Sequence, residues 1–392
     1  MLPLEGITVI SLEQAVAAPF ATRQLADLGA RVIKVERPGV GDFARGYDAT
    51  VRGMSSYFVW LNRSKESLTL DLKRPEAKLV IRGLLEKADI FVQNLAPGAS
   101  ERLSFGTSEL RKKYPRLIVC DLSGYGSSGP YRDKKAYDLL IQAEAGLISI
   151  NGTEQTPSKV GVSIVDISCG MYAYSGILTA LLVRSRTGEG MALETSLFDS
   201  MAEWMSQPAY YTFYGGSAPP RTGANHAQIA PYGPALSGDH KVVYLGLQNE
   251  REWKKFCEGV LQNPKLSLDH RFDSNAKRVQ NRQQLDLVMQ DVFQRLTAAE
   301  IIARLEAAQI ANASLNTVQE FVEHPQLKAR KRWGTVNSPV GSLQALLPPV
   351  KMENVEPVLN EVPAVGQHTD AILAELGFNS ETIAAWRQAG VI

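Results

Sequence analysis

Residues 7–36 read ITVISLEQAVAAPFATRQLADLGARVIKVE, and their pattern indicates the type of fold. Its first six residues, ITVISL, are mostly apolar and predict a buried strand, and its last six, RVIKVE, predict a second one. Between them, PFATRQLADLGA predicts a helix that ends at Gly29, because glycine readily takes the left-handed conformation that follows a helix. A strand, a helix and a second strand form the unit from which parallel sheets are built.

The alternation of strands and helices continues to about residue 125. PEAKLVIRGLLEKA predicts a helix with proline in its first turn, DIFVQN and LIVCDLS predict strands, and residues 166–187 predict a long apolar helix. We therefore expect an α/β fold with a Rossmann-like parallel sheet in a large domain.

A smaller α+β domain is expected further along the chain. KVVYLGL predicts a strand, and three helical segments follow it. One of these helices opens with Thr297 and Glu300 at the spacing of a capping box. Two Pro- and Gly-rich stretches flank the region, and two helices separated by Gly377 end the chain.

The composition excludes several classes of protein. A net charge of +1 with 21% charged residues gives no basic surface for nucleic acid or for an anionic membrane. The three cysteines are widely spaced and odd in number, which predicts no disulfide framework, no zinc site and a reducing cytoplasm. We expect no signal peptide, and the longest apolar run, residues 170–183, is short for a membrane span.

The segment GYGSSGP places Gly124, Gly126 and Gly129 in the G-x-G-x-x-G pattern of dinucleotide-binding proteins. That fingerprint belongs to the first strand–helix unit and requires a helix directly after the third glycine. Here the motif follows a late strand, and the residues after Pro130 have no apolar stripe. We therefore interpret it as a tight loop and expect neither NAD nor flavin.

Seven segments, in order and spanning essentially the whole chain, resemble those of the class III CoA-transferases, also called the CaiB/BaiF or formyl-CoA transferase family. They are residues 4–42, NRSKESLTLDLKRPEAKLV, ADIFVQNLAPGASERL, LSGYGSSGPY, AYDLLIQAEAG, VGVSIVDISCGMYAYSGILTALLVRSRTGEG and VGQHTDAILAELGF. The resemblance implies an enzyme that transfers CoA from an acyl-CoA to a carboxylic acid.

The residue that matches the family's nucleophile is Asp166. A carboxylate can attack a thioester, and the resulting mixed anhydride can take back CoA as an aspartyl-CoA thioester. All steps are acyl transfers, so the resemblance implies coenzyme A as acyl-CoA substrate and no metal, NAD or flavin. The alternative for Asp166 is a plain helix N-cap; the two roles are compatible, since a helix N-terminus stabilises an anion.

The resemblance also implies contacts to CoA. Its phosphates suit arginine and lysine partners, although taken singly each such residue could be a solvated surface charge. The matching positions are Val16, Ala17, Arg37, Leu70, Lys73, Asn94, Leu95, Arg102, Leu103 and Lys135. Val16 stands where formyl-CoA transferase has glutamine, with Gln14 two residues earlier, which argues against formate or oxalate as substrate.

For the acyl group, we expect contacts from a loop and from single residues near the nucleophile. The candidates are Arg45, which could pair with a distal carboxylate, and Tyr137, Asn225, His226 and Tyr232. His226 could instead only bond its own backbone. The chain resembles most closely the members that use succinyl-CoA and a C4–C5 dicarboxylate such as itaconate, mesaconate or citramalate.

Two other functions are compatible with parts of this sequence. Racemases of the same fold, which act on α-methylacyl-CoA, carry a histidine where this chain has Tyr137, and racemisation needs a second acid–base group. A non-catalytic acyl-CoA-binding protein would have no need of Asp166. Transfer is therefore favoured over both.

The resemblance implies a domain division and an assembly. The large domain is expected at residues 1–190 with 366–392, and the small domain at 225–330. Residues 191–224 and 331–365 are expected to be linkers, long enough for the interlocked homodimer that the family forms, with active sites between large and small domains.

Overall fold

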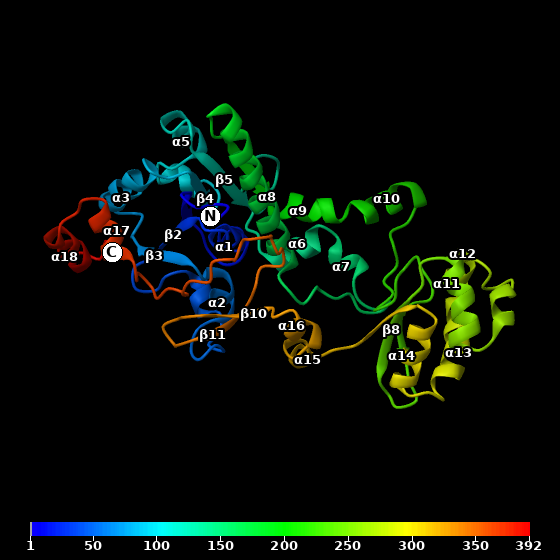
Figure 1. Cartoon of the computed structure of the whole chain (residues 1–392). Coiled ribbons are helices and arrows are strands. Elements are labelled where there is room, and N and C mark those ends of the chain that lie inside the picture. Colours follow the sequence, from blue (N-terminus) through cyan, green and yellow to red (C-terminus); the bar gives the residue numbers. More distant parts are fainter. Residues whose placement is uncertain (1) are drawn as a thin grey trace. The chain divides into compact units, whose positions relative to one another are not determined.

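The computed structural model describes residues 2–392 and divides into two compact units (Figure 1). Unit 1 extends to Ala145 and resumes with Val160–Ser206 and Leu327–Ile392. Unit 2 consists of Gly146–Lys159 and Gln207–Gln326.

Unit 1 is built on a six-stranded sheet in the order β3-β2-β1-β4-β5-β6, and neighbouring strands are parallel throughout. This is the Rossmann strand order, so the predicted α/β class and parallel sheet are confirmed. The strands are β1 Thr8–Leu12, β2 Arg31–Glu36, β3 Lys65–Thr69, β4 Ile90–Gln93, β5 Ile118–Ser123 and β6 Ala192–Ser196.

Helices cover both faces of this sheet, because successive strand residues point to opposite sides. In β1, Ile10 and Leu12 join a core with α3 and α17, while Val9 joins another with α1 and α8. The main helices are α1 Ala17–Asp27, α3 Pro75–Leu85, α5 Thr107–Lys113, α8 Ile164–Thr187, α9 Leu197–Trp204, α17 Thr369–Glu375 and α18 Ser380–Gln388. The remaining helices of the unit are η1 Phe43–Gly46, α2 Ser56–Asn62, α4 Ala99–Arg102 and α6 Asp138–Glu144.

Local signals placed several boundaries correctly. Gly29 follows the last turn of α1 with a φ of +99°, and Gly377 separates α17 from α18 with a φ of +91°. Helix α8 is long and apolar enough to cross a membrane, by length and composition alone. It instead contributes Cys169, Ala173 and Ile177 to the buried core beside α1.

Unit 2 has an antiparallel sheet of β7 Tyr232–Leu236, β8 Val242–Gly246 and β9 Ala311–Ser314. Its helices are α7 Leu147–Ile150, α10 Ser206–Gly215 (whose first residue ends the Val160–Ser206 segment of unit 1), α11 Glu250–Lys255, η2 Phe256–Val260, η3 Pro264–Leu268, α12 Asn275–Gln280, α13 Arg282–Phe293, α14 Ala298–Ala307 and α15 Val318–Val322. The capping box of Thr297 and Glu300 is confirmed at the start of α14. Helix α16, Pro325–Ala329, spans the division between the units.

The compact units differ from the expected domain boundaries. β6 pairs with β5 and α9 follows it, so residues 191–206 belong to unit 1 and are not a linker. Residues 331–365 also lie in unit 1, where β10 Trp333–Val336 pairs with β11 Leu343–Leu346 over a small core that includes Phe58. Gly146–Lys159, expected in the large domain, groups with unit 2.

Candidate active site

Asp166 lies in the first turn of α8, and another residue caps that helix. Asp138, the first residue of α6, accepts hydrogen bonds from the backbone N–H groups of Val165 at 2.8 Å and Asp166 at 3.3 Å. The reading of Asp166 as the N-cap is therefore wrong, since Ser163 is the N-cap and its side chain makes no cap bond. Because Asp138 satisfies the helix end, the Asp166 side chain is left free for another role.

The carboxyl group of Asp166 has an unusual environment for an acid. Within residues 2–392 no side chain or backbone group donates a hydrogen bond to it, and the residue is only partly exposed. Burial, followed by the negative charge of Asp138, raises the pKa of Asp166 to about 7. The helix N-terminus was expected to stabilise the anion, but these two effects outweigh it. A poorly solvated carboxylate whose pKa lies near neutrality is suited to act as a nucleophile.

Tyr47 and Tyr137 lie near Asp166. Burial, and then the charges of Asp42 and Asp166 and the neighbouring Tyr137, raise the pKa of Tyr47 to about 12. Tyr137 is 65% exposed and is the N-cap of α6, directly before Asp138. Tyr47 was not predicted from the sequence, although it lies two residues after the selected Arg45, and the only available signal was that short spacing.

The first turn of α1 approaches the same part of α8. A Cβ on Gly170 would lie 2.5 Å from the carbonyl oxygen of Ala17, so only glycine permits this contact. Gly170 follows Asp166 by about one helical turn. Val16 and Ala17, which the family resemblance selected, are therefore brought to the start of α8.

The other predicted CoA contacts follow the carboxyl ends of parallel strands. These ends meet at one edge of a sheet, where ligands bind in open α/β folds. Arg37 follows β2, Leu70 and Lys73 follow β3, and Asn94 and Leu95 follow β4. Arg102 and Leu103 lie at the end of α4, and Lys135 lies between β5 and α6.

Of the predicted CoA contacts, the arginine and lysine side chains are exposed to solvent. Arg37, Lys73, Arg102 and Lys135 are exposed, and none pairs with a carboxylate of the part of the chain that the structure describes. Leu70 differs, since the whole residue is 1% exposed and its side chain belongs to the core with α3. In this structure it therefore offers almost no surface to a ligand.

The Asn94 side chain is bonded to the backbone of Gln14, at the same edge of the sheet. Its Oδ1 accepts from the Gln14 N–H at 2.8 Å, and its Nδ2 donates to the Gln14 carbonyl at 2.9 Å. The side chain thus ties the loop after β4 to the loop after β1. Leu95 N–H is held in turn by Gln93 Oε1 at 2.7 Å.

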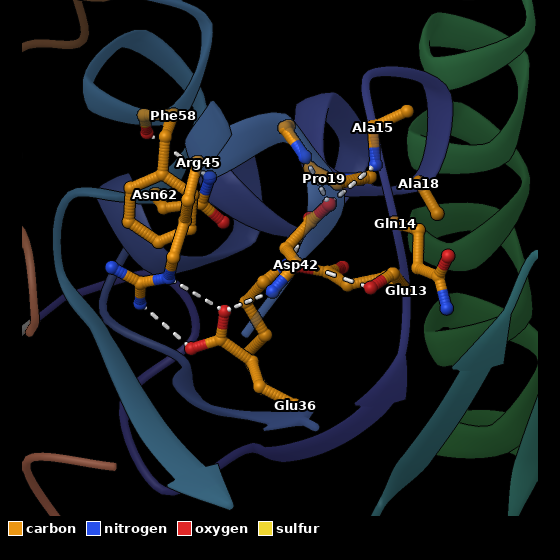
Figure 2. A network of polar contacts seen from close by, with 12 residues as sticks. Glu13, Gln14, Ala15, Ala18, Pro19, Glu36, Asp42, Arg45, Phe58 and Asn62 are labelled. Atoms are coloured by element: carbon orange, nitrogen blue, oxygen red, sulfur yellow. Dashed lines mark hydrogen bonds and ion pairs between the residues drawn. The ribbon is translucent and has the colours of Figure 1, made fainter. Parts of the chain in front are cut away.

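Arg45, which was predicted to pair with a substrate carboxylate, has a partner within the chain. Its Nε and Nη2 donate to the two carboxylate oxygens of Glu36 at 2.9 and 2.7 Å, and its guanidinium lies 3.6 Å from the Phe58 ring centroid (Figure 2). A planar guanidinium that already holds a buried carboxylate with two parallel bonds has no free fork for another.

In unit 2, the three predicted acyl-group residues gather at one place. The His226 N–H donates to the Tyr232 carbonyl at 2.8 Å, and the two rings stack with centroids 5.2 Å apart. Asn225 packs so closely that a Cβ on Gly233 would lie 2.0 Å from its Oδ1. His226 Nδ1 accepts from the Gln228 N–H at 3.1 Å, so the expected alternative of local backbone bonding is present, and Nε2 remains available.

The glycine loop after β5 is bound to its own unit. The Gly126 N–H donates to Ser123 Oγ at 2.9 Å, and the Ser127 N–H and hydroxyl donate to Glu194. No helix begins between Gly129 and Tyr137, which agrees with the interpretation of this motif as a tight loop. In residues 2–392 there is no group of three or more His, Cys, Asp and Glu side chains that could hold a metal ion.

The chain is similar in sequence to a known protein family and to several of its characterised members. The sequence model of CoA-transferase family III matches residues 4–369. A succinyl-CoA:glutarate CoA-transferase of Mus musculus is 33% identical over 384 residues, covering 96% of this chain and 87% of that protein. A succinyl-CoA:mesaconate CoA-transferase of Haloarcula hispanica is 31% identical over 392 residues, covering 97% of this chain and 98% of that protein.

A solved structure is similar over nearly the same length. The crystal structure of a CaiB/BaiF family protein from Brucella suis has a TM-score of 0.83 and 31% identity to this chain. The match covers 96% of this chain and 99% of the other.

Proposed function

This chain belongs to CoA-transferase family III, and on that premise we propose that it moves CoA from succinyl-CoA to a C4–C5 dicarboxylate such as itaconate, mesaconate or citramalate, with Asp166 as nucleophile. The observation that carries the proposal is the Asp166 carboxyl group, which receives no hydrogen bond from residues 2–392 and has its pKa raised to about 7. Relatives whose names pair succinyl-CoA with glutarate or mesaconate support the choice of substrates. No observation favours racemisation or simple acyl-CoA binding.

The first half of the reaction frees succinate. A carboxylate oxygen of Asp166 attacks the thioester carbon, the carbon–sulfur bond breaks, and CoA leaves as a thiolate. The thiolate then attacks the side-chain carbonyl carbon of Asp166 in the mixed anhydride. Succinate departs with the bridging oxygen, and an aspartyl-CoA thioester remains.

The second half repeats these steps with the acceptor. An acceptor carboxylate oxygen attacks the aspartyl thioester and releases the thiolate, which attacks the acceptor carbonyl of the new anhydride. Acceptor-CoA forms and Asp166 is regenerated, carrying one oxygen from the acceptor. No proton, electron or water is consumed in the complete cycle.

The surrounding residues would bind and orient. Arg37, Lys73, Arg102 and Lys135 carry the charges that CoA phosphates require. Burial around Asp166 lowers the solvation of its carboxylate, which makes the anion more reactive once it is deprotonated. Tyr137, Asn225, His226 and Tyr232 remain candidates for contacts to the acyl group.

Oxygen tracing tests the mechanism. The enzyme is incubated with succinyl-CoA and an acceptor labelled with ¹⁸O in its carboxylates, and released succinate is analysed by mass spectrometry. The mechanism predicts that succinate released in the first turnover carries no label, because the oxygen it gains comes from Asp166, and that label appears in succinate only in later turnovers, after Asp166 has taken up an acceptor oxygen. Direct attack of the acceptor carboxylate on succinyl-CoA would instead label succinate in the first turnover. Asp166→Asn provides the control that should show no turnover.

An acceptor panel tests the specificity. Glutarate, itaconate, mesaconate, citramalate, oxalate and acetate are each incubated with succinyl-CoA and the enzyme. Activity confined to monocarboxylates or to oxalate would refute the proposed acceptor class while leaving CoA transfer intact.

We further propose a cytoplasmic homodimer, interlocked as the family resemblance implies. Cys120, Cys169 and Cys257 are all free thiols, as in proteins of a reducing compartment. Helix α10 has no buried residue and exposes Phe213 and Tyr214 at 79% and 86%, an apolar surface that a second copy would cover. Light scattering that gave the mass of a monomer at micromolar concentration would refute the dimer.

A further inference from the structure

A fully buried network of charges lies under the start of α1, at the carboxyl ends of β1 and β2 (Figure 2). The Glu13 carboxylate accepts from Lys65 Nζ at 2.7 Å and from Lys34 Nζ at 3.4 Å, and the same Lys34 donates to Asp42 at 2.8 Å. The Thr22 hydroxyl completes the Glu13 site at 2.6 Å. Burial alone would raise the pKa of Glu13, but Lys65 and Lys34 hold it at about 2.

The network continues to a second ion pair and is balanced in charge. The Asp42 N–H donates to Glu36 at 2.9 Å, and Glu36 is paired with Arg45. The network thus contains three carboxylates and three cations, of which only the Arg45 side chain is exposed, at 14%, while the other five side chains are fully buried. Buried ion pairs add little net stability over apolar residues of similar size, so a network of this extent suggests a role in fixing one conformation.

What the network holds is the segment from Gln14 to Pro19. Asp42 Oδ1 accepts from the Ala15 N–H at 3.2 Å, and Lys65 Nζ donates to the Pro19 carbonyl at 3.0 Å. Ala15 has a φ of +62°, a left-handed conformation that costs an alanine about 1 kcal/mol or more. Strain of this kind persists only where the surroundings determine the backbone, and it gathers at functional sites.

This segment carries the first turn of α1. The Val16 side chain makes no cap bond, and the N–H groups of Ala17 and Ala18 have no acceptor within residues 2–392. The Ala17 carbonyl packs against Gly170, one turn beyond Asp166. The conformation of Ala15 therefore sets where the first turn of α1 stands relative to the nucleophile.

We propose that Asp42, held by Lys34, is a positioning residue for CoA transfer: it fixes the left-handed turn at Ala15 and so places the first turn of α1 beside Asp166. The inference rests on the proposed function of Asp166. Asp42 acts through the Ala15 N–H and does not itself touch the reacting atoms.

The test compares three kinds of variant in steady-state CoA transfer from succinyl-CoA. In Asp42→Asn the charge opposite Lys34 is lost, and we expect kcat to fall about 10- to 100-fold with KM for succinyl-CoA within about threefold, because misplacement of reacting groups affects the transition state more than ground-state binding. Ala15→Val leaves the network intact but disfavours a positive φ, and it should reproduce the same pattern.

Arg63→Met is the matched control. Arg63 makes a buried pair with Asp27 at the other end of α1, with two bonds of 2.8 Å, so its loss destabilises the fold without touching the turn. We expect its kcat to stay within about twofold of the wild type, even where its urea midpoint falls as far as that of Asp42→Asn.

A rescue experiment separates positioning from folding. Glycine adopts positive φ without strain. Ala15→Gly added to Asp42→Asn should therefore reverse at least about a third of the fall in log kcat that Asp42→Asn causes. If Asp42→Asn does not fold, Ala15→Val alone still tests the role of the turn.

The outcomes are distinguishable. If Asp42→Asn and Ala15→Val keep the kcat of Arg63→Met, the positioning role is refuted while transfer through Asp166 stands. If the wild-type enzyme forms no CoA adduct on Asp166 by mass spectrometry, the proposed function fails instead.

Discussion

Replacing Asp166 by asparagine should abolish turnover and at the same time stabilise the folded protein. The pKa of Asp166 rises from its ordinary value of 3.8 to about 7 in the folded chain because burial and Asp138 disfavour the carboxylate. Between these two values the unfolded chain ionises at this position while the folded chain keeps its proton. The stabilising contribution of the protonated group is complete below pH 3.8 and is lost as the pH rises towards 7.

The magnitude follows from the shift. Each pKa unit corresponds to about 1.36 kcal/mol, so a shift of about three units corresponds to about 4 kcal/mol of lost folding free energy above pH 7. Water that reaches the partly exposed side chain reduces this figure, and we expect about 2 to 4 kcal/mol. Asparagine carries no charge at any of these pH values, so the variant escapes the loss.

The assay is urea unfolding, followed by circular dichroism at a fixed protomer concentration, from pH 4.5 to pH 8.5. The advantage of Asp166→Asn over the wild type should grow as the pH rises to 7 and then level off. Asp133→Asn is the control, since that side chain is 78% exposed, and its difference from the wild type should stay flat. A difference for Asp166→Asn that does not change with pH would refute the assigned environment of the nucleophile.

Three other changes test the surroundings of the site. Gly170→Ala puts a methyl group 2.5 Å from a backbone carbonyl oxygen and should lower the free energy of unfolding in urea by about 1 to 3 kcal/mol. Gly176→Ala on the same helix, where the nearest atom lies 3.7 Å from the new methyl group, should be neutral or stabilising. Equal effects of the two changes would contradict the close contact between the helices. Asp138→Asn removes the charge that helps raise the pKa of Asp166, so the acid limb of kcat/KM against pH should move to lower pH, and an unmoved limb would exclude that coupling. Lys135→Gln should raise KM for succinyl-CoA about fivefold at low salt with little change in kcat, and a KM that shows no change at any salt concentration would remove Lys135 from the phosphate contacts.

The elements of unit 1 were largely predictable because their signals are local. The apolar runs at residues 7–12 and 31–36 and the glycine that ends α1 specify strand, helix and strand within thirty residues. The capping box of α14 is equally local. β6 lies within residues 191–224, which were expected to be a linker, because ALETS forms an edge strand with an exposed side and has no long apolar run.

The pairing of charged side chains was not predictable in the same way. Arg45 was expected to meet a substrate carboxylate, but Glu36, at the end of β2, turns back to hold it. Asp138 caps α8 from a separate helix, 28 residues earlier in the chain. Both contacts depend on which strand ends and helix ends meet in space, and no local pattern reports that.

Local sequence patterns were enough to predict four of the six strands of the parallel sheet, the resemblance to the CoA-transferases and the position of Asp166 at the head of the long apolar helix. Periodicity, turn residues and family segments are properties of neighbouring residues, so they can be read without coordinates. The tertiary structure alone decided that Asp166 has no hydrogen-bond donor among residues 2–392, that its pKa rises to about 7, and that a buried network holds Ala15 in a left-handed turn beside it. These features depend on solvent exclusion and on distances between charges, which are set only when segments far apart in the sequence pack together.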